Sequence, residues 1–175
     1  RVDGSERLIV GAQQLPGLSV LLDLEVSPDS TRVAYRANIG GEVMVWISPL
    51  SGDAPVRLWR DPARSWQRGS SWSPDGNWIA YYGNHNERPA VMKAHVGANG
   101  PGEFLANLDL QVPVRWSPRG DWIAFQYGDS LRVVSPDGKQ NRVVSQHTWL
   151  THGWSKDGSA VYGIRSGENR RQLLV

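Results

Sequence analysis

The chain has 175 residues, of which 39% are hydrophobic and 21% are charged, and its formal net charge is +2. This composition is typical of a globular domain, and the scattered basic residues lack the continuous basic face that nucleic-acid binding requires. The sequence contains no apolar run of about 18 residues, so we expect no membrane insertion. Because it contains no cysteine, the chain forms neither disulfides nor thiolate metal sites.

Four segments of the chain repeat one pattern, best seen in Trp72-Ser-Pro-Asp-Gly-Asn-Trp-Ile-Ala-Tyr81. The copies begin at Val26, Trp72, Trp116 and Trp154, which are 46, 44 and 38 positions apart. Repeats of this length, built on short strands and Gly/Pro turns, are typical of β-propeller blades. We therefore predict an all-β fold.

Each copy is predicted to form a strand, a turn and a second strand. In Ser73-Pro74-Asp75-Gly76 the residue types match a type I turn, with Pro presetting φ and Gly allowing left-handed geometry. The turn aspartates are predicted to bind the backbone of their own turn rather than to act as catalytic carboxylates; they are Asp29, Asp75, Asp137 and Asp157. Trp72, Trp116 and Trp154 are predicted to occupy equivalent buried positions between blades.

A second hairpin follows each copy, which gives four antiparallel strands per blade. The whole chain, residues 1–175, is then one domain with sixteen strands: one in residues 2–10, three sets of four, and a final three. Sixteen strands are enough for about four blades. Three arrangements are open: a closed small ring, part of a larger propeller, or a homodimer joined through the terminal strands. Because the chain starts within a hairpin, we expect an excerpt of a longer protein.

The connections between strands are predicted to differ between the two faces of the propeller. Tight turns leave by one face, and segments 38–42, 60–69, 83–89, 146–151 and 166–170 form longer loops on the other. Loops on a rigid scaffold commonly carry recognition residues, and Trp and Arg are enriched at binding hot spots. The candidate partner-binding residues are Arg64, Trp66, His85, Arg88, His147, Trp149 and His152.

Signatures of cofactor and metal sites are not found. His147 and His152 lie five positions apart, a spacing that no regular strand or helix converts into a two-ligand metal site. The glycine-rich segment 97–102 lacks the spacing of a dinucleotide-binding loop, and no Gly-x-Ser-x-Gly nucleophile elbow is present. We therefore predict no cofactor, no metal and no catalysis by this chain.

The Trp-Ser-Pro-Asp-Gly pattern resembles the WD-like repeat of TolB-type propellers, which is also found in tricorn-type and prolyl-oligopeptidase-family propellers. Departures from it are Val26, Ser30, Arg119 and Lys156. The resemblance implies a non-catalytic module that binds a protein or peptide, in a bacterial, extracytoplasmic (periplasmic) setting. The competing interpretation is the substrate-gating propeller of a prolyl-oligopeptidase-like hydrolase. A sialidase-type Asp-box does not fit, because its Asp and Gly are not adjacent.

Overall fold

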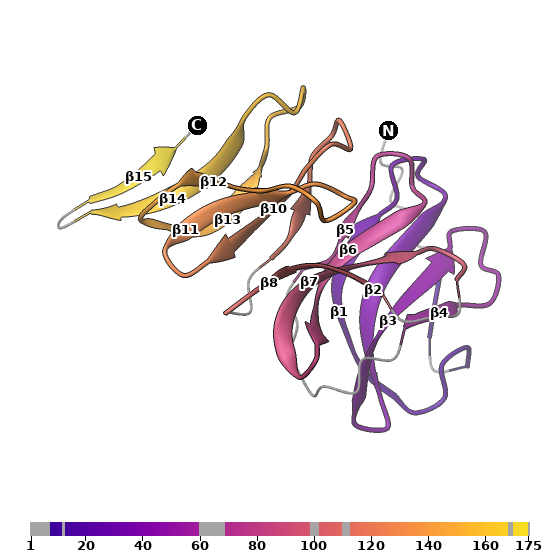
Figure 1. Ribbon diagram of the computed structural model, residues 1–175. Helices are drawn as coiled ribbons and strands as arrows, with labels where there is room; N and C mark the ends of the chain where they lie inside the picture. The colour runs from indigo at the N-terminus through magenta and orange to yellow at the C-terminus, as the bar shows by residue number, and fades with distance from the viewer. Residues whose placement is uncertain are drawn as a thin grey trace.

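The computed structural model describes residues 8–11, 13–59, 69–98, 102–109, 113–167 and 170–174. Regular structure in these residues is β-strand, which confirms the predicted all-β fold. Fifteen described strands form three four-stranded sheets and one three-stranded sheet, all antiparallel (Figure 1). This part of the chain has no helix with the length and hydropathy needed to cross a membrane.

Each sheet is a meander in which consecutive strands are hydrogen-bonded neighbours. The first sheet contains β1 (Leu18–Val26), β2 (Arg32–Ile39), β3 (Glu42–Pro49) and β4 (Val56–Trp59). The second contains β5 (Ser71–Trp72), β6 (Trp78–His85), β7 (Arg88–His95) and β8 (Glu103–Asn107). The third contains β9 (Arg115–Trp116), β10 (Ile123–Tyr127), β11 (Ser130–Val134) and β12 (Asn141–Ser145). The fourth contains β13 (Thr148–Trp154), β14 (Val161–Gly167) and β15 (Arg170–Leu174).

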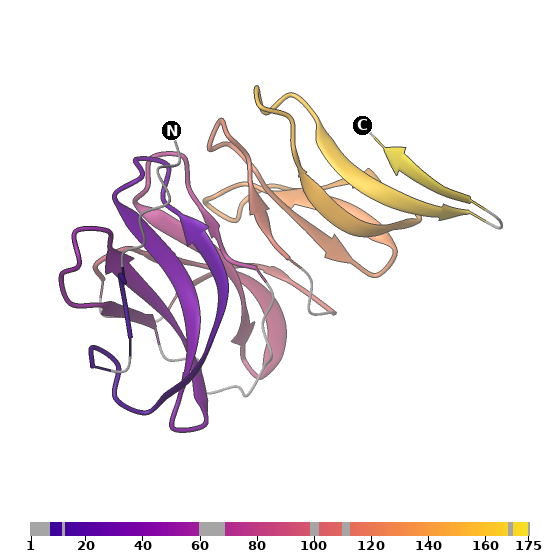
Figure 2. The same ribbon diagram turned by 180° about the vertical axis from the view of Figure 1, so that it is seen from behind.

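The four sheets follow one another in chain order along an open arc, with the first and fourth sheets at opposite ends (Figures 1 and 2). The first strands of successive sheets lie side by side, β5 against β9 and β9 against β13, and we call the strands β1, β5, β9 and β13 the hub. Among the described strands, none of the first sheet pairs with one of the fourth. The described strands therefore do not by themselves form the closed four-sheet ring.

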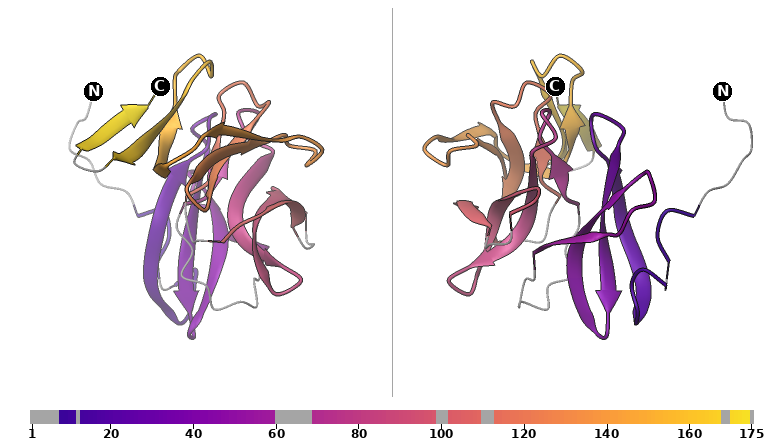
Figure 3. Two further views of the ribbon diagram at one scale, coloured as in Figure 1. Left: turned by 60° about the vertical axis from the view of Figure 1, so that its left-hand side comes forward. Right: turned by 90° about the vertical axis from the view of Figure 1, so that its right-hand side faces the viewer.

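The predicted closing strand, residues 2–10, is not found in the part that the structure describes. Residues 8–10 form no strand, and residues 1–7 lie outside the described residues. Ile9 and Val10 pack instead with Leu15 against the cluster around Val33 and Tyr35 in the first sheet. Apolar burial on this sheet thus holds the segment at the end of the arc far from β13–β15 (Figure 3).

The second sheet is covered on both faces, as its apolar sequence predicts. Ile79 and Tyr81 belong to the core shared with the first sheet, which includes Ala34 and Ile47. Ala80 and Tyr82 point the other way, into the core shared with the third sheet, which includes Ile123 and Phe125. Because side chains alternate along a strand, the run 79–82 fills two cores at once. A third and smaller core, around Val133 and Val161, joins the third and fourth sheets.

The Ser-x-Asp turns, three of which continue with Gly and the first with Ser30, have one hydrogen-bond pattern, which confirms the structural role predicted for their aspartates. The Ser73 hydroxyl donates to Asp75 Oδ1 and accepts from the Trp78 amide, while the Asn77 amide donates to Asp75 Oδ1. The same Ser-to-Asp bond occurs at Asp29, Asp137 and Asp157, at 2.5–2.6 Å. These bonds stabilise the carboxylates and lower their pKa values, that of Asp157 to about 2.

The third turn uses different residues for the same bond. Arg119 stands where the other turns have Asp, and the Ser117 hydroxyl donates instead to Asp121 Oδ1 at 2.6 Å. Arg119 is then free to leave the turn, and its Nε donates to the Asp157 carbonyl of the next turn at 2.6 Å. Arg119 departs from the repeat pattern, but it adds a hydrogen bond between the third and fourth sheets.

The repeat tryptophans lie between sheets, as predicted. Trp72 is 5% exposed and Trp116 is 8% exposed, while Trp154 is half-buried. The Trp72 indole donates to the Glu25 carbonyl at 3.0 Å, and the Trp154 indole donates to the Arg115 carbonyl at 2.9 Å. Each of these bonds joins the first strand of one sheet to that of the preceding sheet, so the tryptophans connect the hub as well as the core.

Candidate binding site at the hub

Of the residues predicted for the binding face, the described ones lie at the β6–β7 hairpin, in the β12–β13 connection and on β13. Arg64 and Trp66 are outside the described residues. Trp149 and His152 lie on β13, each at an irregularity in its pairing with β14. At both positions β13 therefore departs from a regular ladder.

The loops that carry His85 and Arg88 are shorter than predicted. These residues pair with each other at the end of the β6–β7 hairpin, and only Asn86 and Glu87 form the turn, with φ of 51° and 64°. The β2–β3 connection is likewise the two-residue turn Gly40–Gly41. The predicted long loops 38–42 and 83–89 are therefore wrong. The exposed His85 ring contacts Phe104, with ring centroids 4.5 Å apart.

His147 lies in the connection between β12 and β13. Its φ is 59°, and its Nδ1 lies 2.9 Å from Asp129 Oδ2 in the β10–β11 turn. Both side chains are exposed, which limits the contribution of this pair to stability. The described residues bring no third His, Cys, Asp or Glu to any site where a metal ion could be held. His147 is thus placed on the third and fourth sheets, and His85 and Arg88 on the second.

A different group of polar residues comes together at the hub. Glu25, Ser71 and Arg115 each directly precede the first residue of a repeat copy, so they take equivalent places on β1, β5 and β9. The Trp116 amide donates to Ser71 Oγ at 3.0 Å, and the backbone of Trp72 donates to the Glu25 carboxylate in the same way. The hub strands β1, β5 and β9 thus carry an acidic side chain, a hydroxyl and a basic side chain at equivalent positions.

Asp23 and Arg36 extend this group along β1 and β2. The pairing of β1 with β2 is irregular between Leu22 and Glu25, and Asp23 has a φ of 50°, which non-glycine residues rarely adopt. Asp23 forms an ion pair with the buried Arg36, and its Oδ2 also accepts from the Gly69 amide at 3.4 Å. We call Asp23, Glu25, Arg36, Ser71 and Arg115 the hub cluster.

Gly69 lies close to both Asp23 and Arg115 of the hub cluster. A Cβ at this glycine would lie 3.0 Å from Arg115 Nη1 and 3.1 Å from Pro113, and its φ is 72°. Glycine is therefore required here both for the backbone conformation and for the close approach of Arg115. Arg115 Nη1 donates to the Val114 carbonyl at 3.0 Å, which fixes the guanidinium beside its own strand.

Two polar groups of the hub cluster are buried without a partner in the described part of the chain. They are Glu25 Oε2 and Arg36 Nε. Burial raises the pKa of the Glu25 carboxyl to about 7, against the opposing effects of the Arg115 charge and the Trp72 backbone. Buried polar atoms normally have partners, and perturbed pKa values gather at functional sites. The hub cluster is therefore the candidate functional site.

Sequence reasoning missed the hub cluster. The only available signal was that charged residues, Glu25 and Arg115, precede a copy whose first residue is apolar. Asp23 and Arg36 carry no signal of their own, because their proximity depends on the irregular register of β1.

Known structures share this architecture, although neither a protein-family model nor a curated protein sequence matches the chain. TolB from Acinetobacter baumannii aligns with a TM-score of 0.69 at 14% identity, over 88% of this chain and 40% of that one. A putative TolB from Agrobacterium tumefaciens aligns at 0.64 and 20% identity, over 89% and 58%. A chain of the nidogen/laminin complex aligns at 0.67 and 17% identity, over 91% and 61%.

Enzymes are also among the similar structures. They include a prolyl endopeptidase, a gluconolactonase from Xanthomonas campestris and an oligogalacturonate lyase in complex with manganese, with TM-scores of 0.55, 0.64 and 0.67. The chain spans less than two thirds of the length of each protein named here. At identities of 14–20% these likenesses concern the fold: four consecutive sheets of a TolB-like β-propeller.

Proposed function

We propose that this chain is a non-catalytic binding module for a protein or peptide, and that the hub cluster contacts the partner. The observation that carries this proposal is the half-buried Glu25 side chain. One of its carboxylate oxygens is buried without a partner in the described residues, and it lies near the Arg115 guanidinium without forming an ion pair with it. A rigid scaffold that holds unpaired donors and acceptors is suited to select a partner with complementary groups.

Adjacent strands hold the cluster in position for such a role. Ser71 is buried, Glu25 and Arg115 are half-buried, and Asp23 is exposed, so the cluster runs from the core of the hub to solvent. A partner that enters from the Asp23 side would meet acidic and basic groups from three successive sheets. Polar groups arranged in this way favour specificity, because a mismatched partner leaves a buried charge unpaired.

A second surface is proposed from the sequence: the long-loop face, of whose candidate residues the structure describes the side chains of His85, Arg88 and His147. His85 and Arg88 are exposed at the end of the β6–β7 hairpin, and His147 is exposed in the connection between β12 and β13. The hub cluster differs from them in having buried groups without partners. Variants on each surface decide between the two locations.

The experiment is a selection of random peptides on the immobilised chain, followed by calorimetric measurement of Kd. We expect Arg115→Gln to weaken binding of the selected peptides at least about tenfold, as loss of a charged hot-spot contact does. Arg57→Gln, which makes the same change at an exposed position of the outer strand β4, should leave Kd unchanged. Melting curves verify that both variants are folded.

Two results would contradict the proposal. Full binding by Arg115→Gln, together with loss of binding by an Arg88→Ala/His147→Ala variant, would move the site to the hairpin ends. Hydrolysis of the selected peptides by the purified chain would support the competing interpretation as part of a prolyl-oligopeptidase-like hydrolase.

A further inference from the structure

The indole of Trp116 departs from the hydrogen bonding of its two counterparts. Trp72 and Trp154 donate their indole N–H to a carbonyl of the preceding hub strand, at 3.0 and 2.9 Å. Trp116 is only 8% exposed, yet its Nε1 has no acceptor in the described part of the chain. Leaving a buried donor unpaired costs about 1–3 kcal/mol, so this exception among three equivalent positions calls for an explanation.

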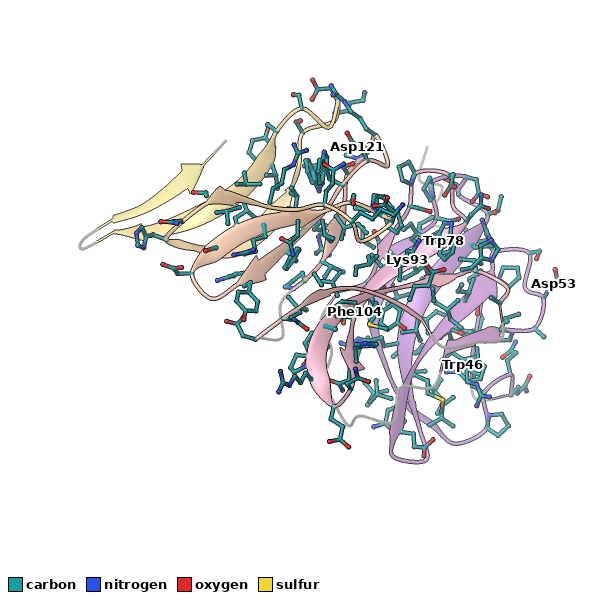
Figure 4. The ribbon with its side chains drawn as sticks, in the orientation of Figure 1. Trp46, Asp53, Trp78, Lys93, Phe104 and Asp121 are labelled. Atoms are coloured by element: carbon teal, nitrogen blue, oxygen red, sulfur yellow. The ribbon has the colours of Figure 1, made fainter. Side chains whose placement is uncertain are left out.

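Trp116 also lines a cleft of about 310 Å³ between the second and third sheets. The cleft opens among the turns that follow β5, β9 and β11, and its other walls include Trp78, Pro74, Gly120 and Pro136. Trp78 is held in place by Lys93, whose Nζ lies 4.1 Å from the ring centroid (Figure 4), and by the edge-to-face ring of His95. Two indoles and two prolines therefore give the cleft a flat, largely apolar lining.

A second departure from the repeat occurs at the same cleft. Arg119, which replaces the usual turn aspartate, is exposed and lines it. Its Nε is bonded to the Asp157 carbonyl, while its two Nη groups have no bond to a described residue. Asp75, opposite, already accepts from Ser73 and Asn77. Among the described residues that line the cleft, Trp116 and Arg119 thus have N–H groups without an acceptor.

We propose that this cleft binds an extended, proline-containing peptide segment. Polyproline II segments have no internal hydrogen bonds, so their carbonyls are free to accept from the exposed Arg119 and, after a small shift of its ring, from the Trp116 indole, whose Nε1 is buried. Their rings match aromatic-lined grooves, in which such segments commonly dock. An acidic segment fits less well, because the Asp75 carboxylate balances the single charge of Arg119.

This proposal rests on the proposed function, since it names the chemistry of a peptide partner next to the hub cluster. Trp116 connects the two: its amide is bonded to Ser71 of the hub cluster, and its side chain lines the cleft. A peptide bound in the cleft would therefore contact Trp116, which is itself hydrogen-bonded to the hub cluster.

The test uses the full chain, 15N-labelled at its nine tryptophan indoles, and an acetylated, amidated nonaproline peptide as probe. We expect a saturable shift of the Trp116 indole resonance and little change at Trp72 and Trp154, whose N–H groups are already bonded. Trp116→Phe should weaken binding at least about tenfold, the equivalent of about 1.4 kcal/mol. Arg119→Gln, at an exposed position, provides a second variant that also weakens binding should Trp116→Phe fail to fold.

The control peptide is a Gly/Ser nonamer, which has free carbonyls but no rings. Equal shifts with both peptides, no saturable shift at millimolar nonaproline, or unchanged affinity in both variants would overturn the proposal. A shift with oligoglutamate in place of nonaproline would assign the cleft to acidic segments and also overturn it. Selected peptides that depend on Arg115 while nonaproline fails to bind would refute the cleft proposal alone and leave the proposed function standing.

Discussion

Trp72 and Trp116 occupy equivalent, buried places in successive sheets, but their indole groups differ in hydrogen bonding. Phenylalanine removes the indole N–H at either position and a similar amount of ring. We expect Trp72→Phe to lower the free energy of unfolding by about 1 kcal/mol more than Trp116→Phe, because only the first change leaves a carbonyl, that of Glu25, without its donor. Urea denaturation measures the difference, and equal losses would mean that the Trp116 indole has an acceptor.

The Glu25 carboxyl makes stability depend on pH in a predictable direction. Burial raises its pKa in the folded chain from 4.5 to about 7, so the folded state binds more protons than the unfolded state between these values. The contribution of Glu25 to stability is therefore highest below pH 4.5 and falls as the pH rises through 7.

Replacing this carboxyl by an amide should remove that dependence. We expect Glu25→Gln to stabilise the chain by about 2 kcal/mol more at pH 8 than at pH 4.5, a figure reduced from the full pKa shift because Glu25 is partly exposed. Urea melts at the two pH values measure this, with Glu42→Gln as the control on an exposed residue of β3. If the wild-type chain and Glu25→Gln lost the same stability between pH 4.5 and pH 8, the result would show that burial does not shift the titration of Glu25.

At the scale of elements, the turn between β9 and β10 shows that one bond can be supplied from two sequence positions. Asp121→Ala removes the carboxylate that accepts from Ser117, and we expect it to cost about 1 kcal/mol. Adding Arg119→Asp should recover part of this loss, since it recreates the arrangement of Ser73 and Asp75 in the preceding turn. Thermal melts of the single and double variants test this, and a double variant less stable than Asp121→Ala would show that the link from Arg119 to Asp157 matters more.

Many of the strands could be predicted because they lie next to turns with strong local preferences. The Ser-Pro-Asp-Gly turns are determined by residues close in sequence, and they set the register of both flanking strands. The β6–β7 turn could not be predicted in this way, because Asn86 and Glu87 both adopt positive φ without a glycine. Pairing along the whole of β6 and β7 imposes this conformation.

The hub cluster could not be predicted for a related reason. Glu25, Ser71 and Arg115 are about 45 residues apart, and their proximity depends on how sheets pack rather than on any local pattern. The irregular register at Asp23 then brings a further acid to Arg36. Sequence repeats located the equivalent positions, but they carried no information on which of these positions has unpaired groups.

At the scale of the whole molecule, the described sheets form a nearly one-dimensional series, in which each contacts mainly its neighbours. The second sheet has an apolar core on both faces, whereas the first sheet is covered on its far face by the segment that contains Ile9 and Val10. Stability in such an array is approximately a sum of sheet and interface contributions. Local opening should therefore differ along the arc.

Hydrogen exchange tests this gradient. We expect the amides of residues 79–82 and 90–92, which lie between two cores, to exchange most slowly, and those of the exposed outer strand β12 and of residues 8–10 to exchange faster. Ile79→Ala, at a fully buried position, should cost about 2–5 kcal/mol and accelerate exchange in the first and second sheets more than in the fourth. Uniform acceleration through β13–β15 would instead mean that the four sheets unfold as a single cooperative unit.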